Sequence, residues 1–140
     1  MLNRDLIGYR LPVFTELVSA AELAAFAAAV GVAAPGPDEG APPTFMKVLE
    51  GRNDSSRHIM QTVLGADLAH ILHAEQHFEY LAPIRAGMRV QVARRIADIY
   101  ERRRGALEFV SIETTFSNDE GEVLGRSRQL VLVRHPKEEA

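Results

Sequence analysis

The sequence contains no cysteine among its 140 residues. A chain without cysteine forms no disulfide framework, no thiolate metal site and no cysteine nucleophile. The sequence also lacks a run of about 18 apolar residues, the length that a helix needs to span a membrane. Met1–Asp5 has no basic region followed by an apolar stretch. We therefore expect no signal peptide, no membrane partner and a cytoplasmic protein.

An excess of positive charge is missing as well. The chain has 16 Lys and Arg against 19 Asp and Glu, for a net charge of −3, which argues against a general nucleic-acid binder. Hydrophobic residues make up 46% and charged residues 25% of the sequence, close to the averages for a globular domain. A chain of this length can bury a core, so we predict a single domain over residues 1–140.

The first half of the chain carries helical patterns after a short extended segment at 11–18. Ser19–Glu22 is a capping box, in which the serine side chain accepts a hydrogen bond from the backbone N–H three residues on. A helix from about Ala20 to Val30 is predicted, and Gly31 is well placed to end it. A proline-rich loop covers 32–43. Two more helices are predicted at Thr44–Glu50 and Ser55–Leu68.

From His70 onward the apolar period changes from about 3.6 to 2. Four extended segments bounded by turn residues follow, at His70–Leu81, Met88–Arg102, Ala106–Ser117 and Val123–His135. Asn118–Gly121 is a strong hairpin signal between the last two. Each segment has one apolar and one mixed face, which favours an antiparallel sheet covered on one side. Helical segments ahead of a run of strands predict an α+β fold.

Histidines are the first candidates for chemistry. On a strand, His73 and His77 would share one face and His70 would lie on the other. No metal-ligand spacing surrounds them, so no metal site is predicted. We favour the simpler interpretation that these are strand histidines at a subunit interface. His58 and His135 lie in polar segments and fit solvated positions.

Arg94 and Arg95 belong to a basic concentration that continues at 102–104. Such a patch can hold phosphates, for instance those of coenzyme A or of an acyl-carrier arm. The alternative, which we favour, is an exposed strand end whose charges discourage edge pairing. The sequence has no nucleophile elbow and no phosphate loop. The residues alone therefore indicate an α+β domain without an obvious catalytic constellation.

Three motifs together resemble the MaoC-like dehydratases, in particular the branch similar to the dehydratase domain of fatty-acid synthase. In the family's order they are Ala41–Phe45 (APPTF), Leu72–Tyr80 with Pro83–Gly87, and the hairpin Asn118–Gly121. The resemblance implies a hot-dog fold, an antiparallel sheet wrapped around a central helix. It also implies paired domains with an acyl-thioester tunnel at their junction. The implied activity is reversible dehydration of (3R)-hydroxyacyl-CoA or acyl-carrier thioesters, without a cofactor.

The sequence departs from the family where the chemistry is done. Active members carry an aspartate after the first helix, in a Gly-Asp-x-Asn-Pro-like segment, and a histidine shortly downstream. Here Val32 occupies the expected aspartate position and no histidine precedes His58. A valine can neither accept nor orient a proton. The resemblance therefore implies an auxiliary subunit, whose heterodimer partner is a catalytic MaoC-like chain that supplies the missing pair.

The resemblance also suggests which residues touch the substrate or the partner. It places Pro43, Thr44 and Phe45 along the acyl tunnel and Gln76 and Phe78 at the subunit junction, although packing explains these positions equally well. Two other functions stay open. One is a homodimeric acyl-thioester hydratase or thioesterase with a relocated site at His73 or Glu75. The other is a non-enzymatic acyl- or CoA-binding module, which would bind its ligand without turnover.

Overall fold

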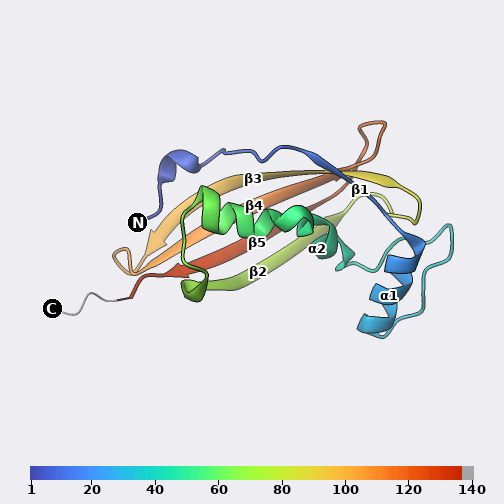
Figure 1. The fold of residues 1–140 in the computed structure, drawn as a ribbon, viewed down its shortest axis with the longest axis horizontal. Helices are drawn as coiled ribbons and strands as arrows, with labels where there is room; N and C mark the ends of the chain where they lie inside the picture. Colours follow the sequence, from blue (N-terminus) through green and yellow to red (C-terminus); the bar gives the residue numbers. More distant parts are fainter. Residues whose placement is uncertain (137–140) are drawn as a thin grey trace.

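The structure is a computed structural model, and it describes residues 1–136. Its main element is a five-stranded antiparallel sheet with the strand order β1-β3-β4-β5-β2 (Figure 1). The strands are β1 (Phe14–Leu17), β2 (Ile71–Tyr80), β3 (Arg89–Arg102), β4 (Leu107–Ser117) and β5 (Val123–Arg134). The two edge strands are therefore β1, with four residues, and β2, with ten.

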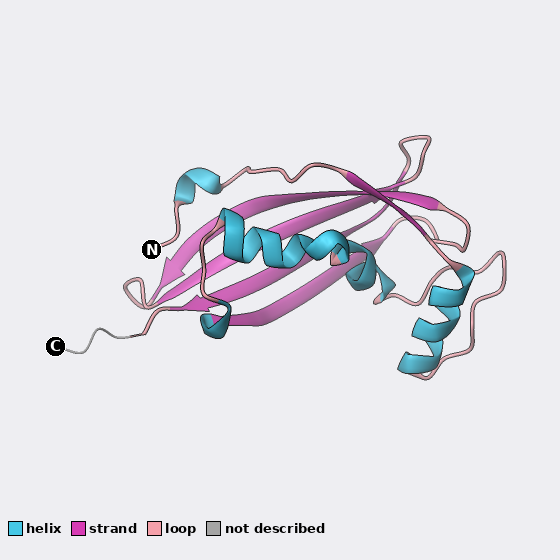
Figure 2. Ribbon diagram, in the orientation of Figure 1, coloured by secondary structure: helices cyan, strands magenta, loops and turns pink. Residues whose placement is uncertain are grey.

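Helical segments cover one face of this sheet. Figure 2 shows α2 (Phe45–Glu50) and the turns after it lying across that face, while α1 (Ala20–Val30) lies at one end. The other helical turns are η1 (Arg4–Leu6), η2 (Arg52–Asp54), α3 (Ser55–Arg57), the π-helical η3 (His58–Val63) and η4 (Leu68–His70). We call the covered side the inner face and the opposite side the outer face. The predicted α+β arrangement, a sheet wrapped around a central helix, is confirmed.

Several predicted element ends are also confirmed. Ser19 Oγ accepts a hydrogen bond from the Glu22 N–H at 3.3 Å. Gly31 ends α1 in the left-handed region, with φ of 80°. In the β4–β5 hairpin, Asn118 Oδ1 accepts hydrogen bonds from the N–H groups of Glu120 at 3.1 Å and Glu122 at 2.9 Å. These side-chain caps satisfy backbone groups that the adjoining elements leave free.

Two predicted elements are wrong in extent. The helix predicted over Ser55–Leu68 is only α3 and the wider turn η3, which ends at Val63. Shortly after that end, Gly65 adopts a φ of 65°, and a left-handed residue interrupts a right-handed helix. The extended segment predicted at 11–18 is a strand only over β1, because Leu11 joins the sheet through a single hydrogen bond to the Arg94 carbonyl oxygen.

The buried side chains form two apolar clusters on the inner face. In one, Ile59 of η3 packs with Ile96 of β3. In the other, Phe45 and Met46 of α2 pack with Val92 of β3. The inward position of β3 between Val92 and Ile96 belongs to Arg94, which is 1% exposed. A buried charge thus separates the two halves of the core.

Candidate functional site

The structure brings several predicted site residues together beside the edge strand β2. On the inner face, Gln76 and Phe78 of β2 lie opposite Gln129 and Ser127 of β5. Gln76 is half-buried and its Nε2 donates to Ser127 Oγ at 2.6 Å. Among residues 1–136, β5 is the only strand that pairs with β2. The other edge of β2 therefore has no strand paired to it in the described part of the chain.

The APPTF motif is tied to the end of this strand. The Tyr80 hydroxyl donates to the Pro43 carbonyl oxygen and lies 3.4 Å from the Pro42 carbonyl oxygen. Pro43 and Thr44 are exposed beside it. Phe45 differs from the tunnel-lining prediction, because its ring is 1% exposed and packs edge-to-face against Phe26 at 5.5 Å. Phe45 is therefore a core residue in this chain.

Tyr80 is expected to titrate later than an ordinary tyrosine. Burial raises the pKa of Tyr80 to about 12, and a backbone hydrogen bond from Met46 acts in the opposite direction. The unfolded state has a tyrosine pKa of about 10, so the stabilisation from this group is present below pH 10 and is lost as the pH rises towards 12. A tyrosinate absorbance titration should show one late phase. Tyr80→Phe should remove that phase and Tyr100→Phe should leave it, whereas a late phase that survives Tyr80→Phe would contradict the assignment.

Arg94 does not belong to a phosphate-binding patch. Its guanidinium is buried and all three nitrogens donate to protein acceptors. These acceptors are Thr114 Oγ1 at 2.9 Å, the Glu50 carbonyl oxygen at 3.0 Å, Ser55 Oγ at 2.8 Å, Ser56 Oγ at 2.9 Å and Gln129 Oε1 at 3.1 Å. Burial lowers the pKa of Arg94, and the Glu50 carboxylate opposes this shift. Arg94 therefore ties the helical segment to strands β3, β4 and β5.

Arg95 takes the opposite side of the sheet. Adjacent residues on a strand point to opposite faces, and Arg95 lies on the outer face, where Nη2 is 2.6 Å from Glu113 Oε2. The basic concentration predicted from sequence is thus divided, with one arginine in the core and one outside. Arg103 and Arg104 form the β3–β4 turn, each with φ of 53°.

Glu50 is a site residue that the sequence reasoning missed. It ends α2 and is fully buried. Its Oε1 lies 3.0 Å from Lys47 Nζ and 3.4 Å from Gln76 Nε2, while Oε2 has no hydrogen-bond partner in the described part of the chain. A buried carboxylate is costly without counter-charges. Lys47 and Arg94 supply them, so the three residues form one polar cluster beneath the β2 edge.

His73 and His77 do not share a face, contrary to the prediction. A β-bulge at Ala74 shifts the register, so His73 pairs with Val131 and His77 with Arg128. Val131 is a core residue, whereas Arg128 lies on the outer face. An extra residue in one strand reverses the alternation beyond it. His73 is exposed, and its Nε2 is 3.1 Å from the Glu75 carbonyl oxygen.

Val32 lies just beyond the C-terminal end of α1. Its backbone N–H donates to the Ala27 carbonyl oxygen at 2.9 Å, and its side chain is 51% exposed. Within residues 1–136, no group of three or more His, Asp or Glu is placed to hold a metal ion. In the same range, no helix has the length and apolarity needed to cross a membrane.

The strand order and the helix laid across one face define a hot-dog fold (Figure 1). Residues 5–126 match the model of the FAS1-like, dehydratase domain region, and the chain belongs to this family. The predicted resemblance to the MaoC-like dehydratases is thereby confirmed. A UPF0336 protein of Cutibacterium acnes is 31% identical over 124 residues, which cover 86% of this chain and 85% of the relative.

Two solved complexes from Mycobacterium tuberculosis share the fold. One is the C-terminally truncated HadBC complex, a (3R)-hydroxyacyl-ACP dehydratase. It matches with a TM-score of 0.73 and 22% identity over 91% of this chain and 97% of that chain. The other is the ChsH1–ChsH2 complex, with a TM-score of 0.71 and 15% identity over 94% of this chain and 87% of that chain. Both structures are complexes of two different subunits.

Proposed function

We propose that this chain is the non-catalytic subunit of a heterodimeric acyl-thioester dehydratase or hydratase. In this assignment the chain forms one wall of the acyl-binding tunnel and stabilises the dimer. A related MaoC-like chain contributes the aspartate and histidine that move the proton. General acid–base catalysis of this kind contributes about 10²- to 10⁴-fold to a rate.

The observation that carries the proposal is the segment after α1. By the resemblance to the family, Val32 takes the place of the aspartate of active members, and the chain has no histidine until His58. His58 is exposed at the start of η3. Glu50, a buried carboxylate within reach of Gln76 on β2, is held by Lys47 and Gln76. These positions offer no proton-transfer pair of the family's kind.

The β2 edge supports a role in pairing. A long edge strand presents backbone N–H and C=O groups that can hydrogen-bond to a strand of another chain. β2 is ten residues long, and Leu72 within it and Leu81 just after it are 52% and 53% exposed. Gln76, Phe78 and the exposed Pro43 and Thr44 flank this edge on the inner side. A partner paired here would meet these side chains, and the tunnel would lie between the two chains.

The test is hydration of crotonyl-CoA and of a longer trans-2-enoyl-CoA. We expect no turnover by the purified chain at high concentration. Mixing it with a MaoC-like chain of the same organism that carries the aspartate–histidine pair should give a stable complex, with a rate at least about 100-fold above the sum of the separate chains.

His73→Ala is the control for a relocated site. In the mixed enzyme this variant should keep its rate within about twofold, because His73 is exposed and its one side-chain hydrogen bond within residues 1–136 is to the Glu75 carbonyl oxygen. Turnover by the chain alone that is lost in His73→Ala would overturn the proposal. Acyl-CoA binding without turnover under every condition would also overturn it, in favour of a binding module.

A further inference from the structure

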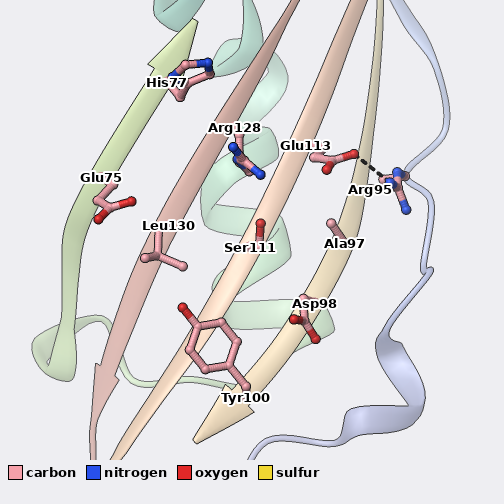
Figure 3. A pocket seen from close by; sticks show the side chains of 10 residues that line it. All are labelled: Glu75, His77, Arg95, Ala97, Asp98, Tyr100, Ser111, Glu113, Arg128 and Leu130. Atoms are coloured by element: carbon pink, nitrogen blue, oxygen red, sulfur yellow. Dashed lines mark hydrogen bonds and ion pairs between the residues drawn. The ribbon is translucent and has the colours of Figure 1, made fainter. Parts of the chain in front are cut away.

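The outer face of the sheet carries two rows of mainly polar side chains across β2, β5, β4 and β3, on the side away from the helical segment, which Figure 3 draws behind the strands. Cross-strand partners point to the same side of a sheet. The register gives a first row of His77, Arg128, Glu113 and Arg95, and a second row of Glu75, Leu130, Ser111 and Asp98. Together these eight residues line most of a hollow of about 560 Å³.

Two β-bulges shape this hollow. One lies in β2 between His73 and Glu75, and the other lies in β3 between Ile96 and Asp98. Both bulges lie at the level of the second row, one in β2 and one in β3, with β5 and β4 between them. Because a bulge bends its strand and increases the local twist, the pair bends the sheet along one line. The acidic side chains of Glu75 and Asp98 stand on this line, at its two ends.

The two rows are complementary to each other under a two-fold rotation. The rotation axis lies in the interface, parallel to the two rows and midway between them. A half-turn about this axis reverses the strand direction, so the first row of one copy lies over the second row of the other copy. Each side chain then faces a residue from its own strand. The contacts, each formed twice, are Arg95 with Asp98, His77 with Glu75, Glu113 with Ser111 and Arg128 with Leu130.

We propose that the outer face is an isologous interface with a second copy of this chain. Each contact in the set joins a donor to an acceptor, except that of Arg128, whose aliphatic stem packs on Leu130. Sheets stacked face to face lie about 10 Å apart, a gap that arginine and glutamate side chains from both sides fill. Arg95 keeps its ion pair with Glu113 and has further donors for the second copy's Asp98.

The charge distribution favours a second copy over other occupants. A uniformly acidic partner would meet Glu75 and Asp98, both exposed, and a uniformly basic one would meet Arg128 and Arg95. Like charges placed across an interface cost several kcal/mol. Only a surface that carries both positive and negative charges, in the same spacing, matches both rows. The inference is independent of the proposed function, because the β2 edge and the outer face are separate surfaces.

The experiment is a mixing test with two variants that each place like charges together. In Arg95→Glu, residue 95 faces the second copy's Asp98. In Asp98→Lys, residue 98 faces the second copy's Arg95. An equimolar mixture of the two variants restores opposite charges at both contacts. Sedimentation equilibrium of the full-length chain measures the association constant, with circular dichroism to verify that each variant is folded.

We expect the wild-type chain to double its mass with rising concentration, whether the step is monomer to dimer or dimer to tetramer. Each variant alone should associate on the order of 100-fold more weakly, and the mixture should recover most of the wild-type affinity. Arg85→Glu and Asp38→Lys, exposed changes away from this face, should have no effect alone or mixed. The inference is overturned if the wild-type chain shows no such step, if either variant associates normally, or if the mixture stays as weak as its components.

Discussion

Arg94→Met is expected to lower the free energy of unfolding by about 3–5 kcal/mol, because it leaves several buried acceptors without a donor and removes one of the two positive charges that face the buried Glu50 carboxylate. The Arg94 guanidinium makes five hydrogen bonds, to side chains of β4 and β5 and to groups at Glu50, Ser55 and Ser56. Methionine fills most of the volume but donates to none of these acceptors. Urea unfolding of the isolated chain measures the loss.

Two further variants separate charge from packing. Arg95→Met removes an arginine from the half-exposed ion pair with Glu113, and it should cost no more than about 1 kcal/mol. Arg94→Met combined with Glu50→Gln removes both buried charges, so it should recover part of the stability lost in Arg94→Met alone. If Arg94→Met and Arg95→Met destabilise equally, the inner network does not hold the helical segment to the sheet.

The inward position of Arg94 was available from the sequence pattern. Val90 and Val92 alternate with outward residues, and the same period continued by two residues places Arg94 on the apolar face with Ile96. On β4, Thr114 stands in the same way between Ile112 and Phe116. Side-chain type suggested a surface residue, but position decided its burial. The acceptors on Ser55, Ser56 and Gln129 come from distant segments, and no local pattern links them.

The orientation of the histidines was not available from the sequence. Strict alternation over β2 predicts His73 and His77 on one face, and the bulge at Ala74 separates them. Nothing in the residues around Ala74 marks a bulge, since no glycine or proline lies between Ile71 and Tyr80. The main strands were predictable because their ends are set by local turn residues such as Asn118 and Gly121. A register shift is a property of two paired strands, so one strand's sequence does not reveal it.

A lysine pair on the β2 edge, Ala74→Lys with Leu81→Lys, is expected to weaken association with the catalytic partner on the order of 100-fold, about 2.7 kcal/mol. Lysine on an edge strand opposes pairing with another strand, because its ammonium must leave water when the edge is covered. Ala74 is exposed at the bulge and has no cross-strand partner, and Leu81 is 53% exposed. The fold of the single chain should therefore be unchanged. Titration of the catalytic chain, followed by crotonyl-CoA hydration, gives the affinity.

The opposite edge of the same sheet provides the matched control. Val13 and Leu17 are 59% and 62% exposed at β1, so Val13→Lys with Leu17→Lys adds the same charge to an edge of only four residues. This variant should keep the wild-type affinity and rate. An equal loss in both lysine pairs would point to net charge rather than to the β2 edge. If only the β1 lysine pair lost affinity for the catalytic chain, the interface would be assigned to the β1 edge of the sheet. The tunnel would then not lie beside Gln76 and Phe78.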